Sequence, residues 1–462
     1  MDTPHRDHAI VIGGSMAGLL TARALADLFA RVTVIERDRL PDGPHARKGV
    51  PQARHVHILL LRGQAILEQW FPGLEDELGA LGAPRLDVTQ DGLWLNRAGW
   101  GPVFASGRYG RTCSRDLREW AVRRRLRAIP AICFREECDV VGLLAGPTGA
   151  CVTGVRVRPR GQTTGGAAVE ENLAADLVVD AAGRGSRAPE WLAALGYARP
   201  QELVINSFLG YSSRYYAPPE DFVPPWQGLY IQPAPPAHMR GGGIYRVEDG
   251  RWLVTLVGIG GDYPPTADPD FLEFARSLRS PVLYEALRHA TPLSPVTGYR
   301  GTANRWRYYE RLARRPEQFV VIGDAACAFN PVYGQGMTAA AQGAATLAAA
   351  LRDQRRRHPD GDLRGLAARF QRQLARNNRP LWAIATLEDF RCPQTVGGRP
   401  TPADRVAQRY IDRVLRRSTT DRVAYLTLVE VLQLVQPLHA LVRPGMLARV
   451  LRPGGAPPPA VI

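Results

Sequence analysis

Apolar residues near the start of the chain follow two different periods. Residues 8–12 form a mostly apolar run, which predicts a buried strand. After a glycine-rich turn, alanine and leucine dominate up to residue 30 and predict a helix. Residues 31–35 predict a second buried strand. A strand, a helix and a strand in this order are typical of a parallel sheet.

The turn at residues 13–18 has the features of a dinucleotide-binding turn. Gly13 permits a tight turn out of the strand, and Gly18 lets the helix pack closely on the sheet. The backbone N–H groups between them would face a pyrophosphate at the helix N-terminus. Glu36 ends the second strand and would accept hydrogen bonds from a ribose. Ser15 departs from the pattern, because it stands where the middle glycine is expected.

The pattern further along predicts five more regions. Residues 116–128 predict a helix, and short β-rich runs fill residues 140–180. Residues 200–300 are rich in Tyr, Pro and Gly and contain alternating strands and a hairpin, so we expect an antiparallel sheet there. A buried strand at 319–322 leads into an alanine-rich helix, and the chain is helical from about residue 366.

Composition excludes several classes of function. The chain has 462 residues, of which 45% are hydrophobic and 22% charged, as in ordinary globular proteins. Its net charge is +15, but Lys48 is its only lysine, and the arginine clusters at 123–125 and 355–357 carry no interleaved aromatic residues. We therefore expect no nucleic-acid partner. The six cysteines lack metal-ligand spacing, so we expect no metal. With no bilayer-length apolar run and no signal peptide, we expect a cytoplasmic protein without stable membrane insertion.

Two later segments belong with the first turn. The first reads Asp180-Ala181-Ala182-Gly183-Arg184-Gly185-Ser186-Arg187, a strand end followed by a glycine-rich turn. The second runs from Gly323-Asp324 through Phe329-Asn330-Pro331 to Gly334-Gln335-Gly336-Met337. Together, the three segments resemble the single-component FAD monooxygenases of the aromatic-hydroxylase type (group A). That resemblance implies that Asp324 bonds a ribitol hydroxyl, and that the loop from Pro331 to Met337 brings N–H groups and a helix N-terminus against the isoalloxazine.

Within that superfamily, the chain most resembles the epoxidases of polyether polyketide pathways, such as the monensin and lasalocid epoxidases. The shared motifs are the 13–18 turn, the segment at 47–57, the 180–187 turn, and Phe329-Asn330-Pro331 with Tyr333-Gly334. The resemblance covers about residues 8–340. It implies the following cofactor-binding residues: Gly13, Ser15, Met16, Ala17, Gly18, Glu36, Arg37, Lys48, Gln52, Arg115, Asp180, Gly183, Gly323, Asp324, Pro331, Gly334, Gly336 and Met337.

The resemblance also implies a fold and a division of the chain. We expect an α/β fold, with a Rossmann-like FAD-binding domain, an inserted antiparallel β-sheet substrate domain and C-terminal helices. The expected regions are a discontinuous FAD-binding domain at 1–200 and 300–360, the substrate domain at 201–299, a helical region at 361–452 and a disordered tail at 453–462.

The activity implied is that of an oxidoreductase in secondary metabolism. A monooxygenase of this kind inserts one oxygen atom from O2 through a flavin C4a-hydroperoxide, so the flavin does the chemistry and we assign no certain catalytic side chain. NADH or NADPH would donate electrons transiently. The expected reaction is epoxidation of alkenes in a hydrophobic intermediate of polyketide biosynthesis. Candidate wall residues of the substrate pocket are Tyr211, Trp226, Tyr230 and Tyr245, each of which also suits a core position.

Other readings of the same cradle stay open. The chain could instead be an FAD-dependent aromatic hydroxylase or other oxidative tailoring enzyme, or a flavin-dependent reductase of isoprenoid chains. A separate flavin reductase could supply the electrons. A flavin halogenase is disfavoured, because it needs an active-site lysine beyond the first turn and no lysine follows Lys48. His55 and His57 are expected to be structural or to bond near the flavin. The sequence leaves the oligomeric state open.

Overall fold

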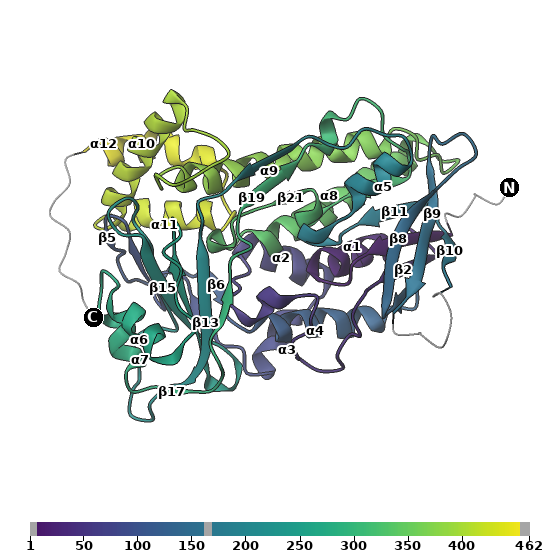
Figure 1. Ribbon diagram of the computed structural model, residues 1–462. Coiled ribbons are helices and arrows are strands. Elements are labelled where there is room, and N and C mark those ends of the chain that lie inside the picture. The colour runs from purple at the N-terminus through teal and green to yellow at the C-terminus, as the bar shows by residue number, and fades with distance from the viewer. Residues whose placement is uncertain (1–6, 161–168, 453–462) are drawn as a thin grey trace.

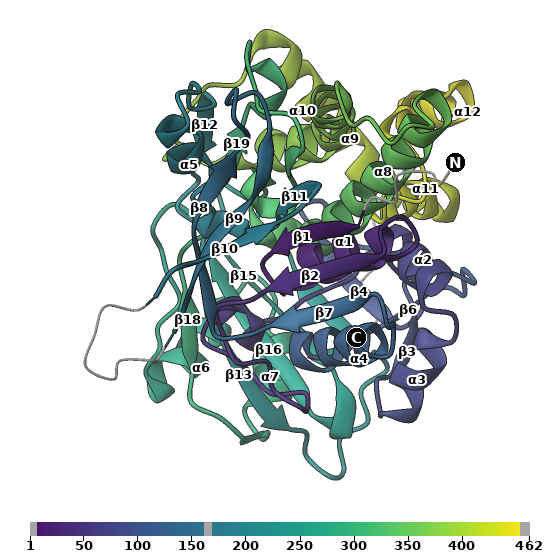
Figure 2. The ribbon, with the colours of Figure 1, turned by 90° about the vertical axis from the view of Figure 1, so that its right-hand side faces the viewer.

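The protein is described from a computed structural model, which describes residues 7–160 and 169–452. Its central sheet is fully parallel and has the order β20-β11-β1-β2-β7. Figure 2 shows four of these strands side by side, from β11 to β7. The strands are β1 (His8–Ile12), β2 (Arg31–Ile35), β7 (Ile132–Arg135), β11 (Leu177–Asp180) and β20 (Phe319–Val321). The predicted disordered tail at 453–462 lies outside the described residues.

Helices cover this sheet because each carries one apolar face. The predicted first helix is present as α1, which packs against β1, β2 and α8. Its leucines share one buried cluster with the sheet and with the alanines of α8. The helices of this layer are α1 (Met16–Ala26), α2 (Leu61–Trp70), α3 (Leu74–Ala80), α4 (Arg115–Arg127), α5 (Ala188–Ala194), α8 (Gly336–Arg357) and α9 (Leu366–Asp389). The predicted helix at 116–128 is α4, and Ser114 caps it by accepting from the Leu117 N–H.

Three small antiparallel sheets complete this half of the molecule. The first packs against the central sheet and has the order β10-β9-β8. Its strands are β8 (Cys138–Ala145), β9 (Val152–Pro159) and β10 (Glu171–Ala174). The second joins β12 (Glu202–Ile205), β19 (Asn304–Arg307) and β21 (Cys327–Ala328), and the third pairs β3 (Arg85–Asp87) with β6 (Tyr109–Arg111).

The predicted antiparallel region forms a large sheet of order β17-β13-β16-β15-β14-β4-β5, with β18 paired to β13. The predicted hairpin is confirmed: β15 and β16 are antiparallel, and Asp249 and Gly250 connect them at positive φ. Helices α6 (Asp268–Arg276) and α7 (Val282–Leu287) share its buried cluster. The strands are β4 (Gly92–Asn96), β5 (Gly99–Trp100), β13 (Gly210–Ala217), β14 (Gly228–Ile231), β15 (Arg240–Arg246), β16 (Trp252–Gly258), β17 (Thr291–Pro292) and β18 (Thr297–Tyr299).

This sheet does not respect the expected boundary at residue 200. Strand β4 comes from the first hundred residues, yet it pairs in parallel with β14, with Leu93 opposite Leu229. A short strand carries no local signal for the sheet it joins, because side-chain alternation is the same in either sheet. The large sheet is therefore built from two separate parts of the chain.

The C-terminal helices sit on the end of the large sheet, as the yellow ribbons of Figure 1 show. They are α10 (Pro402–Ser418), α11 (Arg422–Leu432), the 3₁₀ helix η7 (Leu438–Val442) and α12 (Pro444–Leu451). Thr401 and Asp404 form a capping box at the start of α10, and Asp421 caps α11. Their buried cluster packs against Trp94 of β4. Among the described residues, no helix is long and apolar enough to cross a membrane.

Candidate functional site

A cavity of about 1130 Å³ joins the carboxyl end of the parallel sheet to the large sheet and the C-terminal helices. Its lining begins at the turn after β1 and at Glu36, continues along the 181–187 turn and Asp324, and reaches the loop from Pro331 to Met337. Beyond that loop it passes the tyrosines of the large sheet and ends among α10, α11 and η7. Ligands of open α/β sheets bind outside the carboxyl ends of their strands, which is where this cavity starts.

The turn after β1 is built for close approach of backbone atoms. Gly13 has a φ of 102°, a conformation that favours glycine. A Cβ on Gly18 would lie 1.7 Å from the Gly13 carbonyl oxygen, so no other residue fits there. No side chain caps α1, so the N–H groups of its first turn are left for a ligand at the positive end of the helix dipole. The predicted roles of Gly13 and Gly18 in shaping the turn agree with this geometry.

Glu36 is held at the edge of the turn. Its carboxylate accepts hydrogen bonds from the Gly14 N–H at 2.7 Å and the Asp38 N–H at 3.0 Å. Arg47 Nη1 lies 3.1 Å from Glu36 Oε2. One Glu36 oxygen is thus fully engaged by the protein, and the other keeps acceptor capacity toward the cavity.

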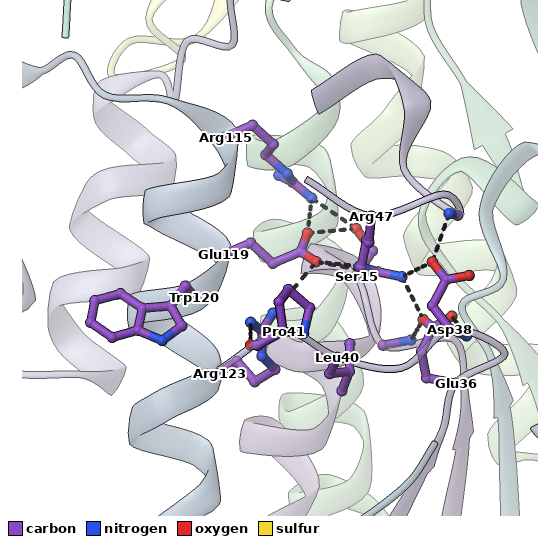
Figure 3. Close-up of polar contacts among 12 residues, drawn as sticks. Ser15, Glu36, Asp38, Leu40, Pro41, Arg47, Arg115, Glu119, Trp120 and Arg123 are labelled. Carbon is purple, nitrogen blue, oxygen red and sulfur yellow. Dashed lines mark hydrogen bonds and ion pairs between the residues drawn. The ribbon is translucent and has the colours of Figure 1, made fainter. Parts of the chain in front are cut away.

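Ser15 takes part in a buried ionic network that Figure 3 shows. Its hydroxyl donates to Glu119 Oε2 at 2.9 Å and accepts from Arg115 Nη2 at 2.8 Å. Arg115 also pairs with Glu119 at 2.8 Å. The small polar side chain at the expected glycine position therefore ties the turn to α4, and its hydroxyl is already used within the protein.

Arg47 is the centre of this network. It pairs with Glu119 at 2.9 Å, with Asp38 at 3.0 Å and with Glu36. Burial alone would lower the pKa of Arg47, but the charges of Glu119 and Glu36 raise it above its ordinary value. Burial also opposes ionisation of Glu119, but the charges of Arg115 and Arg47 hold the pKa of that carboxyl below its usual range. Arg47 and Glu119 are therefore both charged near neutral pH.

The segment after β20 forms a further part of the cavity wall. Gly323 has a φ of 61°, and a Cβ there would lie 2.9 Å from the Ala17 side chain, so this segment is held against α1. The next residue, Asp324, is half-buried, lines the cavity and lies 3.6 Å from Arg184 Nε. Burial raises the pKa of Asp324. Gly336 and Met337 begin α8, which no side chain caps, so a second helix N-terminus faces the cavity.

A buried carboxyl from α9 holds the loop between these points. Asp389 accepts hydrogen bonds from the Tyr333 hydroxyl at 2.8 Å, from Asn304 Nδ2 at 2.6 Å and from Asn330 Nδ2 at 3.0 Å. Only 3% of Asp389 is exposed, and this burial raises its pKa to about 6. Asn330 in turn caps the 3₁₀ helix at Pro331–Tyr333 through the Val332 N–H. Asp389 thus fixes the loop that the resemblance places against the flavin ring.

We predict a pH-dependent effect of Asp389→Asn. A raised carboxyl pKa stabilises the fold below about pH 4, and that contribution is lost as the pH rises through 6. Asparagine does not titrate. The free energy of unfolding of the variant, relative to that of the wild type, should therefore be about 2 kcal/mol higher at pH 8 than at pH 4. Urea denaturation at several pH values measures this difference. A difference that stays flat, or moves in favour of the wild type, would contradict the prediction.

The wall of the cavity that the large sheet forms contains three of the four predicted aromatic residues. Tyr211, Tyr230 and Tyr245 line the cavity, and burial raises the pKa of each phenol. Trp226 does not line it: this side chain packs in the core of the large sheet, 5.7 Å from the Trp252 ring. For Trp226 the core position is therefore the one observed: it lies just before β14 and packs in the buried cluster of the large sheet.

Of the two predicted histidines beside this wall, His55 is buried and His57 is half-buried. His55 Nδ1 lies 2.8 Å from Ser213 Oγ, and the His55 ring meets Tyr211 edge to face at 4.5 Å. Burial lowers the pKa of His55 to about 3 and that of His57 to about 4, so both rings are neutral near pH 7. His57 Nδ1 lies 3.0 Å from the His55 carbonyl oxygen.

Most of the predicted cofactor residues meet at the cavity although they come from distant parts of the chain. The ones that line it are Gly13, Ser15, Met16, Ala17, Glu36, Arg37, Gln52, Arg115, Gly183, Asp324, Pro331, Gly334, Gly336 and Met337. Four others stand behind or outside it. Gly18 and Gly323 shape the backbone, Asp180 is buried and accepts from the Ala182 N–H and the Ser186 hydroxyl, and Lys48 is exposed.

Sequence reasoning missed Arg47, Glu119, Arg184 and Asp389. Arg184 donates to the carbonyl oxygens of Ala303 at 2.7 Å and Phe329 at 2.6 Å, which joins the middle segment to the last one. Arg47 and Arg184 lie inside motifs that were recognised, so their charge was the available signal. Glu119 and Asp389 gave none, because each acts on a segment far away in the sequence.

We compared the sequence and the fold with those of known proteins. No family model matches the chain. Protein Rv3254 of Mycobacterium tuberculosis is 35% identical over 402 residues, which cover 83% of this chain and 80% of that protein. Among solved structures, the myxobacterial chondrochloren halogenase CndH, an FAD-dependent halogenase, has a TM-score of 0.62 at 17% identity and covers 89% of this chain and 90% of its own. PqsL, a probable FAD-dependent monooxygenase from Pseudomonas aeruginosa, has a TM-score of 0.58 at 17% identity, covering 84% and 96%.

The fold is thus that of the FAD-dependent oxidative enzymes, a class that includes halogenases and monooxygenases. The predicted α/β fold, a parallel sheet with a further antiparallel sheet and C-terminal helices, is confirmed. The chain belongs to the family of Protein Rv3254 of Mycobacterium tuberculosis.

Proposed function

We propose that this protein is an FAD-dependent monooxygenase that inserts one oxygen atom from O2 into a hydrophobic substrate. The observation that carries the proposal is the single cavity that joins a dinucleotide groove to an apolar chamber. A cofactor in the groove and a substrate in the chamber would meet at the loop from Pro331 to Met337. That arrangement suits a reaction in which the cofactor transfers oxygen and the protein excludes water.

The residues present fit FAD. Glu36 would bind the adenosine ribose, and the N-terminus of α1 would bind the pyrophosphate. Asp324 would bind the ribitol, and the N-terminus of α8 would stabilise negative charge on the reduced ring. When bound, the flavin supplies the reduction of O2 and the oxygen atom that is transferred. The protein positions the substrate and keeps the site dry.

The finer proposal is epoxidation of an alkene in a polyketide-type intermediate. It is supported by the motifs shared with polyether epoxidases and by the apolar chamber beyond the loop from Pro331 to Met337. We propose that NADH or NADPH binds transiently, or that a separate flavin reductase delivers the electrons. Lys48, the only lysine in the sequence, is exposed and does not line the cavity, which favours oxygenation over a lysine-dependent halogenation.

Oxygen labelling tests this proposal. The purified protein should bind one FAD, take up O2 after reduction, and convert the probe 1-dodecene to an epoxide that carries one ¹⁸O atom from ¹⁸O2. Phenol, as a second probe, distinguishes aromatic hydroxylation. A reductase would instead saturate a double bond without label in the product. Absence of FAD binding, or no O2 uptake by the reduced enzyme, would refute the monooxygenase.

Asp324→Ala should weaken FAD binding by about 10- to 100-fold, because hydrogen bonds to a charged partner contribute about 1.5–3 kcal/mol. Titration of the FAD-free protein, followed by quenching of flavin fluorescence, measures the change. Asp353→Asn, at the far end of α8 from the cavity, is the matched control and should keep the wild-type affinity. Equal affinities for both variants would remove Asp324 from the cofactor site.

A further inference from the structure

The cavity continues beyond the loop from Pro331 to Met337, which we call the flavin loop. Its lining continues into the space between the large sheet and the C-terminal helices, where α9, α10, α11 and η7 contribute side chains. This part, which we call the helical arm, is walled by apolar residues: Ile384, Ile411, Leu415, Leu428, Leu432 and Leu441. A hydrophobic ligand gains free energy in proportion to the apolar surface that it buries here.

The helical arm opens to solvent at η7. Leu438 and Val442 line the cavity and are nevertheless 36% and 51% exposed, whereas Leu441 between them is buried. An exposed leucine or valine by itself needs no explanation. These two differ because each borders both the cavity and the surface, so they form the rim of a mouth. The helices that carry this mouth lie at the opposite end of the molecule from β8 and β9 (Figure 1).

Charges in the helical arm are already paired within the protein. Glu388 forms ion pairs with Arg97 and with Arg391, the latter at 3.0 Å. Asp404 accepts from the Thr401 N–H at 2.8 Å in the capping box of α10. A charged ligand group in this arm would lose its hydration without gaining a free partner from these two acids, which is costly. The arm therefore suits an uncharged chain.

The walls of the cavity extend from the C-terminal helices to the loop at Pro331. To reach the loop at Pro331 from the rim at Val442, a molecule must pass between the aliphatic walls of the helices and the tyrosines of the large sheet, Tyr230 and Tyr245. A compact ring of the same carbon number cannot touch the walls along this whole path. An extended chain can, and it buries more apolar surface for the same number of carbons.

We propose that the substrate is an elongated, uncharged and mainly aliphatic chain that enters through the mouth formed by Leu438 and Val442. The cofactor fills the other arm, from the turn after β1 to the flavin loop. This inference rests on the proposed function and adds to it the shape and polarity of the substrate and its route of entry.

Trp substitutions at the mouth test the route. Val442→Trp narrows the rim, and Leu438→Trp does so from the neighbouring position. Val423→Trp, on α11, is the matched control, because Val423 is also 51% exposed but does not line the cavity. Substitutions at such exposed positions usually change stability little, so each variant should fold. The probes are 1-dodecanol and cyclododecanol, which have the same number of carbons, and calorimetric titration of the FAD-loaded protein measures their affinities.

Because a narrowed entrance slows entry and exit alike, the route is tested by the association rate: in stopped-flow mixing we expect Val442→Trp and Leu438→Trp to slow 1-dodecanol association at least 10-fold, and Val423→Trp to slow it less than 2-fold. The wild type should bind 1-dodecanol at least 10-fold more tightly than cyclododecanol, and all variants should keep the flavin absorbance of the wild type. Equal effects of the three substitutions, or equal affinities for the two alcohols, would overturn this inference and leave the monooxygenase standing. A wild type that binds no FAD would overturn both.

Discussion

Replacing Arg47 with methionine is expected to lower the free energy of unfolding by about 3–5 kcal/mol, the usual cost of breaking a buried ion pair. Arg47 is only 7% exposed and lies within 3.1 Å of oxygens from Glu36, Asp38 and Glu119. Methionine keeps an unbranched apolar stem but removes the charged guanidinium. Glu119 would then keep Arg115 within 3 Å. Glu36 and Asp38 would each lose the ion pair that they form with Arg47. Urea denaturation of the FAD-free protein measures the loss.

Two variants show whether the charge itself is responsible. Arg356→Met, at the exposed end of α8, should change the free energy of unfolding by less than about 0.5 kcal/mol. The double variant Arg47→Met/Glu119→Gln should be more stable than the sum of the single effects predicts, because the two residues share one network. Additive effects, or a loss of less than about 1 kcal/mol for Arg47→Met, would show that the network is not a buried ionic one.

Gly18→Ala should both destabilise the protein and abolish tight FAD binding. The added Cβ would lie 1.7 Å from the Gly13 carbonyl oxygen and 2.9 Å from its carbon, and both are backbone atoms. Relief of this overlap requires α1 to move away from β1. We expect a loss of about 3 kcal/mol or more in the free energy of unfolding, and at least 100-fold weaker FAD binding, because the turn that faces the pyrophosphate is displaced.

Gly445→Ala is the control for this substitution. Gly445 is also helical, in α12, and nothing lies within 4 Å of a Cβ placed on it. Since alanine is the better helix former, the variant should be as stable as the wild type or slightly more so. If Gly18→Ala were to bind FAD like the wild type, the close contact between α1 and β1 would not be needed for the groove.

The local parts of the cradle were predictable because short-range rules govern them. The order of β1, the glycine turn, α1 and β2 followed from apolar periodicity and from the conformational freedom of Gly13, which indeed has a positive φ. The hairpin of β15 and β16 followed from its turn residues. The helical C-terminal region followed from apolar spacing, and α9 to α12 lie there.

Other features depended on pairings that no local pattern encodes. Nothing in residues 92–96 distinguishes a strand of the first domain from one that pairs with β14. The network around Arg47 joins residues up to 104 positions apart in the sequence, and Asp389 reaches the Tyr333 loop from 56 positions away. Such contacts appear only when the fold brings the segments together.

The sequence by itself determined the glycine turn that we propose binds the cofactor, because a phosphate-binding turn needs particular residues within a few positions of one another, and backbone sterics allow few substitutes. The tertiary structure alone decided what surrounds that site: Ser15 bonded to Glu119, the loop anchored by Asp389, and the apolar arm that opens at Leu438 and Val442. The reason is physical. Side-chain packing and charge pairing act over distance in space, so they are independent of distance along the chain.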